Sequence, residues 1–185
     1  MTAVLPVMCS YRMQWFYIVV LSILACNIYG VVHDQITTRI CVEYFTVGHA
    51  PIFDTDDPTL LGLGWGIVGT WWVGLFLGFP LATFARVSNL PKRTAVSLIR
   101  PMFVLFVCTA VVAAVAGIVG LVAASNGWIS LNPDLATRIP PDKHTSFLVD
   151  LWIHNTSYTG GFVGAVFLMA WVWWTRIKTN TGKGT

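Results

Sequence analysis

Histidine and carboxylate side chains that could bind a metal ion or transfer protons are concentrated in two polar segments, residues 33–59 and 125–155. Imidazole nitrogens and carboxylate oxygens are common ligands of Zn, Mn and Fe, and both groups also act as general acids and bases. If the two segments meet in space, the catalytic candidates are His33, Asp34, Glu43, Asp150 and His154. The same side-chain types predict a divalent metal ion as cofactor, with the candidate ligands His33, Glu43, His49 and His154.

Residue spacing in the second polar segment, 125–155, indicates which side chains would share one face of a helix. Asp150, His154 and Tyr158 recur every four residues, so a helix would place them on one face. A carboxylate one turn before a histidine can accept an N–H bond and orient the imidazole while its other nitrogen acts. In the first segment, the same spacing predicts an Arg39–Glu43 ion pair if the preceding helix continues beyond the membrane.

The alternative interpretation is that these polar residues are solvated loop residues and helix caps at a membrane surface. The sequence has no HExxH motif and no closely spaced histidine triad. The run Asp54-Thr55-Asp56-Asp57 is similar to part of a calcium loop but lacks its glycine and distal glutamate. We therefore expect a turn and a helix cap before Pro58, and spacing alone leaves both interpretations of the histidines open.

Four apolar runs must position these polar segments. The 185-residue chain is 56% hydrophobic and 10% charged, with a mean hydropathy of +0.71. Soluble domains contain about 25% charged residues, and four nearly uncharged runs of about 20 residues are rare in a soluble all-α protein. The first run is longer than the apolar part of a signal peptide and no small-x-small site follows it, so we expect it to be retained.

The sequence predicts an all-α fold, a single membrane domain over residues 1–185 that forms an integral membrane four-helix bundle. The expected helices cover about 13–32, 60–85, 101–124 and 156–175, with Pro101 at the start of the third. Two polar extracytoplasmic loops, 33–59 and 125–155, join them. The lipid bilayer is the expected environment, and the net charge of +3 does not indicate nucleic acid, because the basic residues lie at the ends of the apolar runs.

Charge asymmetry predicts how the chain is threaded. Segments 1–12, 86–100 and 176–185 contain eight of the eleven basic residues and no acidic residue. The two polar loops contain all eight acidic residues and all four histidines. Cytoplasmic ends of membrane helices are enriched in Lys and Arg, so we expect both termini in the cytoplasm and both polar loops outside.

The small residues of the second and third runs favour one class of function. Gly74-x-x-x-Gly78 and the stretch AVVAAVAGIVG are typical of closely packed membrane helices. The first hypothesis is therefore a structural or accessory membrane component that packs with itself, as a homo-oligomer, or with a membrane-protein partner. The alternative is a membrane-bound enzyme or metal-binding protein that uses the outer histidines and carboxylates. A transporter ranks third, because the expected helices contain no charged residue and no histidine.

One stretch also carries a family resemblance. YGVVHDQITTRICVEYFTVGH, followed by DPTLLGLGWGIVGTWWVGLFLGFPLA, resembles a group of small bacterial multi-pass membrane proteins that share a Tyr-Gly-x-x-His-Asp-Gln pattern, a Glu-Tyr-Phe-Thr pattern and a Trp-Trp-containing helix. The resemblance is most specific over residues 29–85. It implies a multi-pass protein of the bacterial cytoplasmic (inner) membrane and a role for the His-Asp-Gln stretch, and it implies no particular reaction.

The threading leads to a direct test. A reporter protein that fluoresces only in the cytoplasm should be bright when fused to either terminus, because the positive charge at both ends holds them there. Whole-cell fluorescence of the two fusions measures this. The same reporter inserted after Asp56 should stay dark, and a dark fusion at either terminus would contradict the threading.

Overall fold

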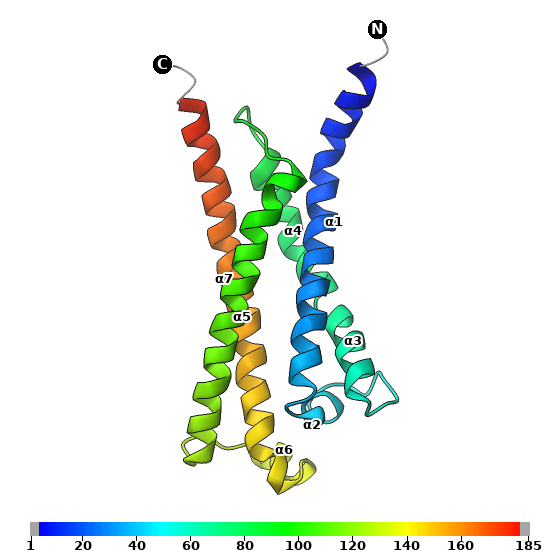
Figure 1. The fold of residues 1–185 in the computed structure, drawn as a ribbon, viewed down its shortest axis with the longest axis vertical. Helices are drawn as coiled ribbons and strands as arrows, with labels where there is room; N and C mark the ends of the chain where they lie inside the picture. The colour runs from blue at the N-terminus through cyan, green and yellow to red at the C-terminus, as the bar shows by residue number, and fades with distance from the viewer. Residues whose placement is uncertain (1–3, 182–185) are drawn as a thin grey trace.

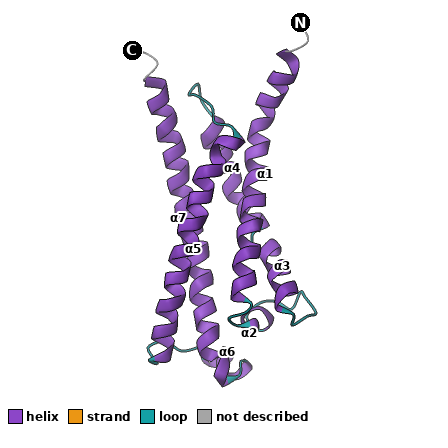
Figure 2. Cartoon of the chain, viewed as in Figure 1, coloured by secondary structure: helices purple, strands orange, loops and turns teal. Residues whose placement is uncertain are grey.

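The computed structural model describes residues 4–181 and, from Met13 onward, their side chains. The described chain is mostly helical, with loops between the helices and without a strand (Figures 1 and 2). Its long helices are α1 (Val4–Thr37), α3 (Pro58–Val68) with α4 (Trp71–Arg86), α5 (Ala95–Ser125) and α7 (His144–Thr181). The short helices α2 (Val42–Thr46), α6 (Pro133–Arg138) and η1 (Pro141–Lys143) lie in the two connections at one end of the bundle.

In the part of the chain that the structure describes, four helical segments are long and apolar enough to cross a membrane: Met13–Thr37, Pro58–Arg86, Ala95–Ser125 and Pro141–Thr181. The predicted all-α four-helix bundle is therefore confirmed. The two polar connections that contain α2 and α6 lie together at one end, and the ends of α1 and α7 that lead to the termini lie at the other (Figure 1).

Several helix bounds differ from the sequence prediction. The expected outer loops are partly helical, because α1 continues to Thr37 and α7 already begins at His144. α5 begins at Ala95 rather than Pro101, since Thr94 and Ser97 form a reciprocal capping box that satisfies the first amides of the helix. The expected cap before Pro58 is confirmed, because the Asp57 carboxylate accepts the amides of Thr59 and Leu60 at 2.8 and 2.9 Å.

The bundle consists of two helix pairs. α1 packs along α3 and α4, and α5 packs along α7, whereas contacts of α4 with α7 and of α1 with α5 are less extensive. Figure 1 shows α1 and α7 diverging toward the ends that carry the termini. The seam between the pairs is therefore where cavities are expected in this fold, since side chains there have fewer partners.

Glycines set the spacing within the first pair. A Cβ added to Gly66 would come within 2.5 Å of the Cα of Val31, and one added to Gly74 within 2.6 Å of the Cα of Ile23. Both approaches are to backbone, which cannot rotate away. Small residues allow this contact between membrane helices, so Gly66 and Gly74 fix α1 against α3 and α4.

The second membrane-spanning segment is interrupted between α3 and α4. Side chains form hydrogen bonds with the backbone carbonyls at this break. Thr70 bonds the carbonyl of Gly66 and the Asn27 side chain of α1, and the Tyr158 hydroxyl donates to the carbonyl of Gly69 at 3.3 Å. Broken membrane helices are tolerated when neighbouring groups satisfy the freed backbone in this way. The break therefore ties α3 and α4 to both α1 and α7.

At the end of the bundle that carries the termini, a buried arginine organises the α4–α5 connection. Arg176 of α7 is 1% exposed and donates to the carbonyls of Phe84, Val87, Leu90 and Pro91. A charge-assisted bond is about twice as strong as a neutral one. The basic connection 87–94 is thereby held against the last turns of α7.

The glycine contact predicts a specific loss of stability. Gly66→Ala should destabilise the protein by about 1–3 kcal/mol, because the added methyl group overpacks a backbone contact. Thermal unfolding in detergent, followed by circular dichroism, measures the shift. Gly160→Ala is the matched control, since its Cβ would meet only Thr109 at an ordinary 3.7 Å; equal midpoints for the two variants would contradict the packing.

Candidate functional site

Three side chains from two distant parts of the chain meet near the end of the bundle that carries α2 and α6. His33 and Asp34 come from α1, His154 comes from α7, and one potential ligand atom of each lies within 4.8 Å of the others. Asp34 and His154 are 7% and 6% exposed. The Asp34 Oδ1 lies 3.3 Å from the His154 Nε2. The sequence predicted that all the candidates of the two polar segments would meet, and the structure brings three of them into one cluster.

The orientation of His154 is set by its own helix. Its Nδ1 lies 2.9 Å from the backbone carbonyl of Asp150, one turn earlier in α7. A carbonyl only accepts hydrogen bonds, so the Nδ1 carries the proton. In neutral His154 the Nε2 then presents a lone pair to the carboxylate of Asp34, and two acceptors face each other. A proton or a metal ion between these atoms resolves the conflict.

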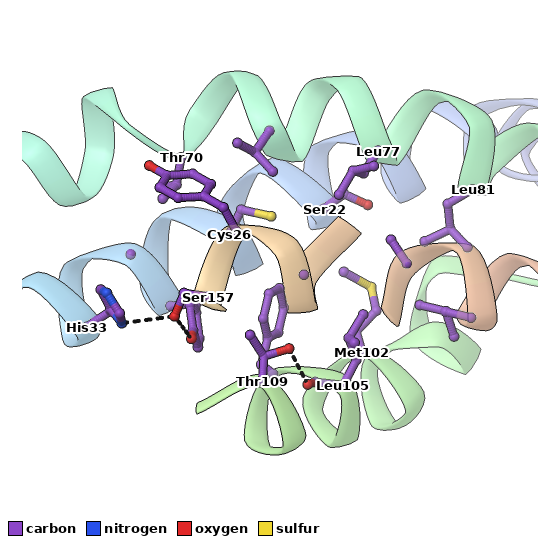
Figure 3. Close-up of a pocket in the computed structure, with 18 of the residues that line it drawn as sticks. Ser22, Cys26, His33, Thr70, Leu77, Leu81, Met102, Leu105, Thr109 and Ser157 are labelled. Carbon is purple, nitrogen blue, oxygen red and sulfur yellow. Dashed lines mark hydrogen bonds between the residues drawn. The ribbon is translucent and has the colours of Figure 1, made fainter. Parts of the chain in front are cut away.

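His33 ends a short polar chain that crosses the seam between the helix pairs (Figure 3). The Tyr29 hydroxyl lies 2.9 Å from the Ser157 Oγ, which in turn lies 3.4 Å from the His33 Nδ1. The buried Nε2 of His33 has no hydrogen-bond partner among the described residues. The His33 and His154 rings meet edge to face, with centroids 4.7 Å apart. One histidine nitrogen in the cluster is thus available as a ligand.

The role of Asp150 differs from the expectation. We predicted that its carboxylate would orient His154, but the backbone carbonyl does so, because in a helix the i−4 carbonyl is already directed along the axis toward the later side chain. The Asp150 side chain is fully buried, and neither carboxylate oxygen has a hydrogen-bond partner among the described residues. Burying an unpaired carboxyl group is costly, and Asp150 lies close to the backbone amide of Cys41.

Glu43 and His49 lie outside this three-residue cluster. Glu43 accepts a weak bond from the Cys41 thiol at 3.3 Å, and the His49 Nδ1 lies 2.9 Å from the carbonyl of Tyr44. The predicted Arg39–Glu43 pair is wrong, because α1 ends at Thr37 and the i,i+4 geometry is lost. Arg39 instead donates to Gln35 and to Thr59, which joins α1 to the start of α3.

Aromatic side chains of α2 and its neighbours cover the cluster. The Tyr44 and Phe45 rings lie 4.4 and 5.5 Å from the His154 ring, and both residues, with Phe147, are buried. Burial raises the pKa of Tyr44, and the charges of Asp150 and Asp34 raise it further. Burial also lowers the pKa of His49, which packs on Tyr44. This aromatic cover is therefore uncharged at neutral pH.

Next to the cluster, a cavity of about 100 Å³ extends along the inside of the bundle, away from the end that carries α2 and α6. His33, Asp34 and His154 line one part of it, and hydroxyl groups of Ser22, Thr70 and Thr109 line the rest together with apolar side chains (Figure 3). Since a water molecule occupies about 30 Å³ in the liquid, the volume suits a few waters or a small ligand group beside the histidines.

Two members of the polar chain were missed from the sequence. Tyr29 lies one turn before His33 in α1, and Ser157 lies three residues after His154 in α7. Those spacings put each residue on the same helix face as its histidine. The signal was present, but a tyrosine and a serine in an apolar run do not by themselves indicate a site.

Comparison with protein-family models, with curated proteins and with solved structures finds no match to this chain. The chemistry must therefore be inferred from the geometry. Two imidazoles and one carboxylate form a ligand set found in zinc enzymes and in non-haem iron centres, both of which keep an open coordination position.

The coupling of Asp34 with His154 can be measured. Asp34→Ala and His154→Ala should each destabilise the protein, but the double variant should lose about 1–3 kcal/mol less than the sum, because each single variant leaves a buried polar partner behind. Reversible unfolding in mixed micelles gives the values. Asp56→Ala combined with His154→Ala, a distant and exposed partner, should be additive; additivity for Asp34 as well would show that the pair does not interact.

Proposed function

We propose that this chain is a multi-pass protein of the bacterial cytoplasmic membrane that binds one divalent transition-metal ion through His33, Asp34 and His154. The observation that carries the proposal is the pair of acceptor atoms, the His154 Nε2 and the Asp34 Oδ1, which face each other at 3.3 Å. A cation between them would turn this unfavourable contact into two ligand bonds.

The surroundings of His154 support a metal ligand. Metal-binding histidines nearly always donate their other ring N–H to a carboxylate, a backbone carbonyl or water, which fixes the tautomer. The Asp150 carbonyl accepts such a bond from His154. His33 has a comparable arrangement, with the Ser157 hydroxyl near one nitrogen and no partner for the other among the described residues.

The position of the three side chains within the bundle supports a functional site. Ionisable groups within membrane-spanning helices are expensive and mark sites of ion, proton or ligand chemistry. His33, Asp34 and His154 all lie in segments that are apolar enough to span a membrane. A solvated helix end, the alternative interpretation from the sequence, does not fit side chains that are 6–7% exposed, as Asp34 and His154 are.

The three-ligand set favours a reactive centre over a purely structural one. Structural zinc sites use four protein ligands, whereas catalytic sites keep a position for water or substrate. When bound, the ion would supply Lewis acidity or a bound water with a lowered pKa. His33, Asp34 and His154 would hold it, and the aromatic cover of Tyr44 and Phe45 would limit access of bulk water.

The accessory-component hypothesis loses its main support. Gly66 and Gly74 are already in contact with the backbone of α1, and Gly117 and Gly120 with Ile153 and Trp152 of α7. These small residues are used within the chain and do not require a partner. For orientation, we propose that the basic α4–α5 connection and both termini face the cytoplasm, as the charge asymmetry favours.

Metal analysis tests the function. Protein purified in detergent and equilibrated with Zn²⁺ should retain about one ion per chain after desalting, and His33→Ala and His154→Ala should lose most of it. Mass spectrometry of the elements gives the stoichiometry. His144→Ala and Glu43→Gln are the matched controls, because neither residue belongs to the cluster; equal metal content in all five proteins would reject the site.

A further inference from the structure

The cluster is closed toward the polar end of the bundle. Tyr44, Phe45 and Phe147 are at most 8% exposed and form one apolar group with Cys41, Leu61 and Ile139. Tyr44 and Phe45 contact the His154 ring directly. A water-soluble ligand approaching from this end would have to displace the whole aromatic cover, so this direction is a poor entrance.

One member of the cluster, His33, also lines a groove at the side of the bundle. A groove of about 910 Å³ lies between α1 and α5, at the seam where the two helix pairs have few mutual contacts. Its lining comes almost wholly from apolar side chains, and the exceptions are Tyr29, His33 and Thr37. The groove extends over Leu21–Thr37 of α1, with Ile40 just beyond it, and over Ile99–Leu121 of α5, so it lies along the membrane-spanning segments.

The groove and the inner cavity share a wall. Tyr29, His33 and Phe106 line both spaces, and their rings stack, with centroids 5.2 Å apart for Tyr29 and Phe106 and 5.7 Å for Tyr29 and His33. His33 is therefore the residue at which the lateral groove meets the metal-binding cluster. A molecule lying in the groove could bring a polar group to His33 without passing through water.

Location and lining determine which molecule fits. A groove that opens along apolar spans is reached from the hydrocarbon region of the bilayer, so its occupant must be dissolved in the membrane. Its volume lies within the range of about 300–1,000 Å³ that is typical of ligand pockets. An extended alkyl chain satisfies the apolar walls, and a polar head satisfies the single polar region at Tyr29, His33 and Thr37.

We propose that the α1–α5 groove binds the chain of an amphipathic lipid and presents its polar head to the metal centre at His33, so that the substrate class of this site is a long-chain membrane lipid. The proposal rests on the proposed metal function for its second half, the delivery of the head group. The binding of the chain in the groove can be tested separately.

The probe is a palmitic acid analogue with a mid-chain diazirine, added to the full-length protein in phosphatidylcholine nanodiscs and activated by light. Peptide mass spectrometry should find labels on the groove-lining residues Phe103, Val107 and Ala114. Val111, Val115 and Val119, which lie on the same helix but do not line the groove, should carry about tenfold less. Excess unlabelled palmitate should remove the groove labels only. Equal labelling of both faces, or labels that unlabelled palmitate does not reduce, would overturn the proposal.

Two variants separate the groove from the metal centre. Ala114→Trp fills the groove and should lower its labelling about tenfold, whereas Val115→Trp, the matched control on the outer face, should not. His154→Ala, a change in the cluster at a residue that does not line the groove, should lose the metal and keep the labels. If the wild-type protein binds no metal but the groove still labels specifically, the metal function fails and the lipid site stands. If Ala114→Trp labels like the wild type, the groove is not the binding site.

Discussion

Two hydrogen-bond acceptors face each other inside a helical bundle: the Nε2 of His154 and the carboxylate of Asp34, 3.3 Å apart. This arrangement follows from the bond between the His154 Nδ1 and a backbone carbonyl, which fixes the proton on the opposite side of the ring. In water the conflict would be screened, but in a buried site it is not. The contact therefore requires a proton or a metal ion between these two atoms, and the site is best understood from that requirement.

The rest of the fold holds the two helices that create this requirement. Gly66 and Gly74 allow α1 to lie directly on α3 and α4, and the α3–α4 break ties that pair to α7 through Tyr158. α7 is fixed at its other end by Arg176, which binds four carbonyls near the α4–α5 connection. His154 is thus carried by a helix with contacts at both ends, and His33 by a helix packed on α3 and α4, while the seam beside them keeps a groove.

Sequence reasoning predicted the fold class and the number of apolar spans, and its larger set of candidates included the three residues that the structure clusters, because each depends on composition or on residue type. Hydrophobic runs of about 20 residues are specified by bilayer thickness, so the spans could be read directly. Glu43 and His49 were grouped with His33 because all three lie in one polar segment. The chain turns after Thr37, and α2 then packs as a cover, which separates them from the cluster. Pairings of this kind depend on tertiary packing, as does the use of the Asp150 carbonyl in place of its carboxylate.

The central claim is that a metal ion lies between these side chains, and X-ray absorption spectroscopy of the zinc-loaded protein in lipid nanodiscs tests it most directly. The account predicts a first shell with two imidazole nitrogens at about 2.0 Å and at least one carboxylate oxygen, and a zinc signal with this shell that is mostly lost in His154→Ala. A shell of oxygens alone, or imidazole scattering that is unchanged in the variant, would contradict it.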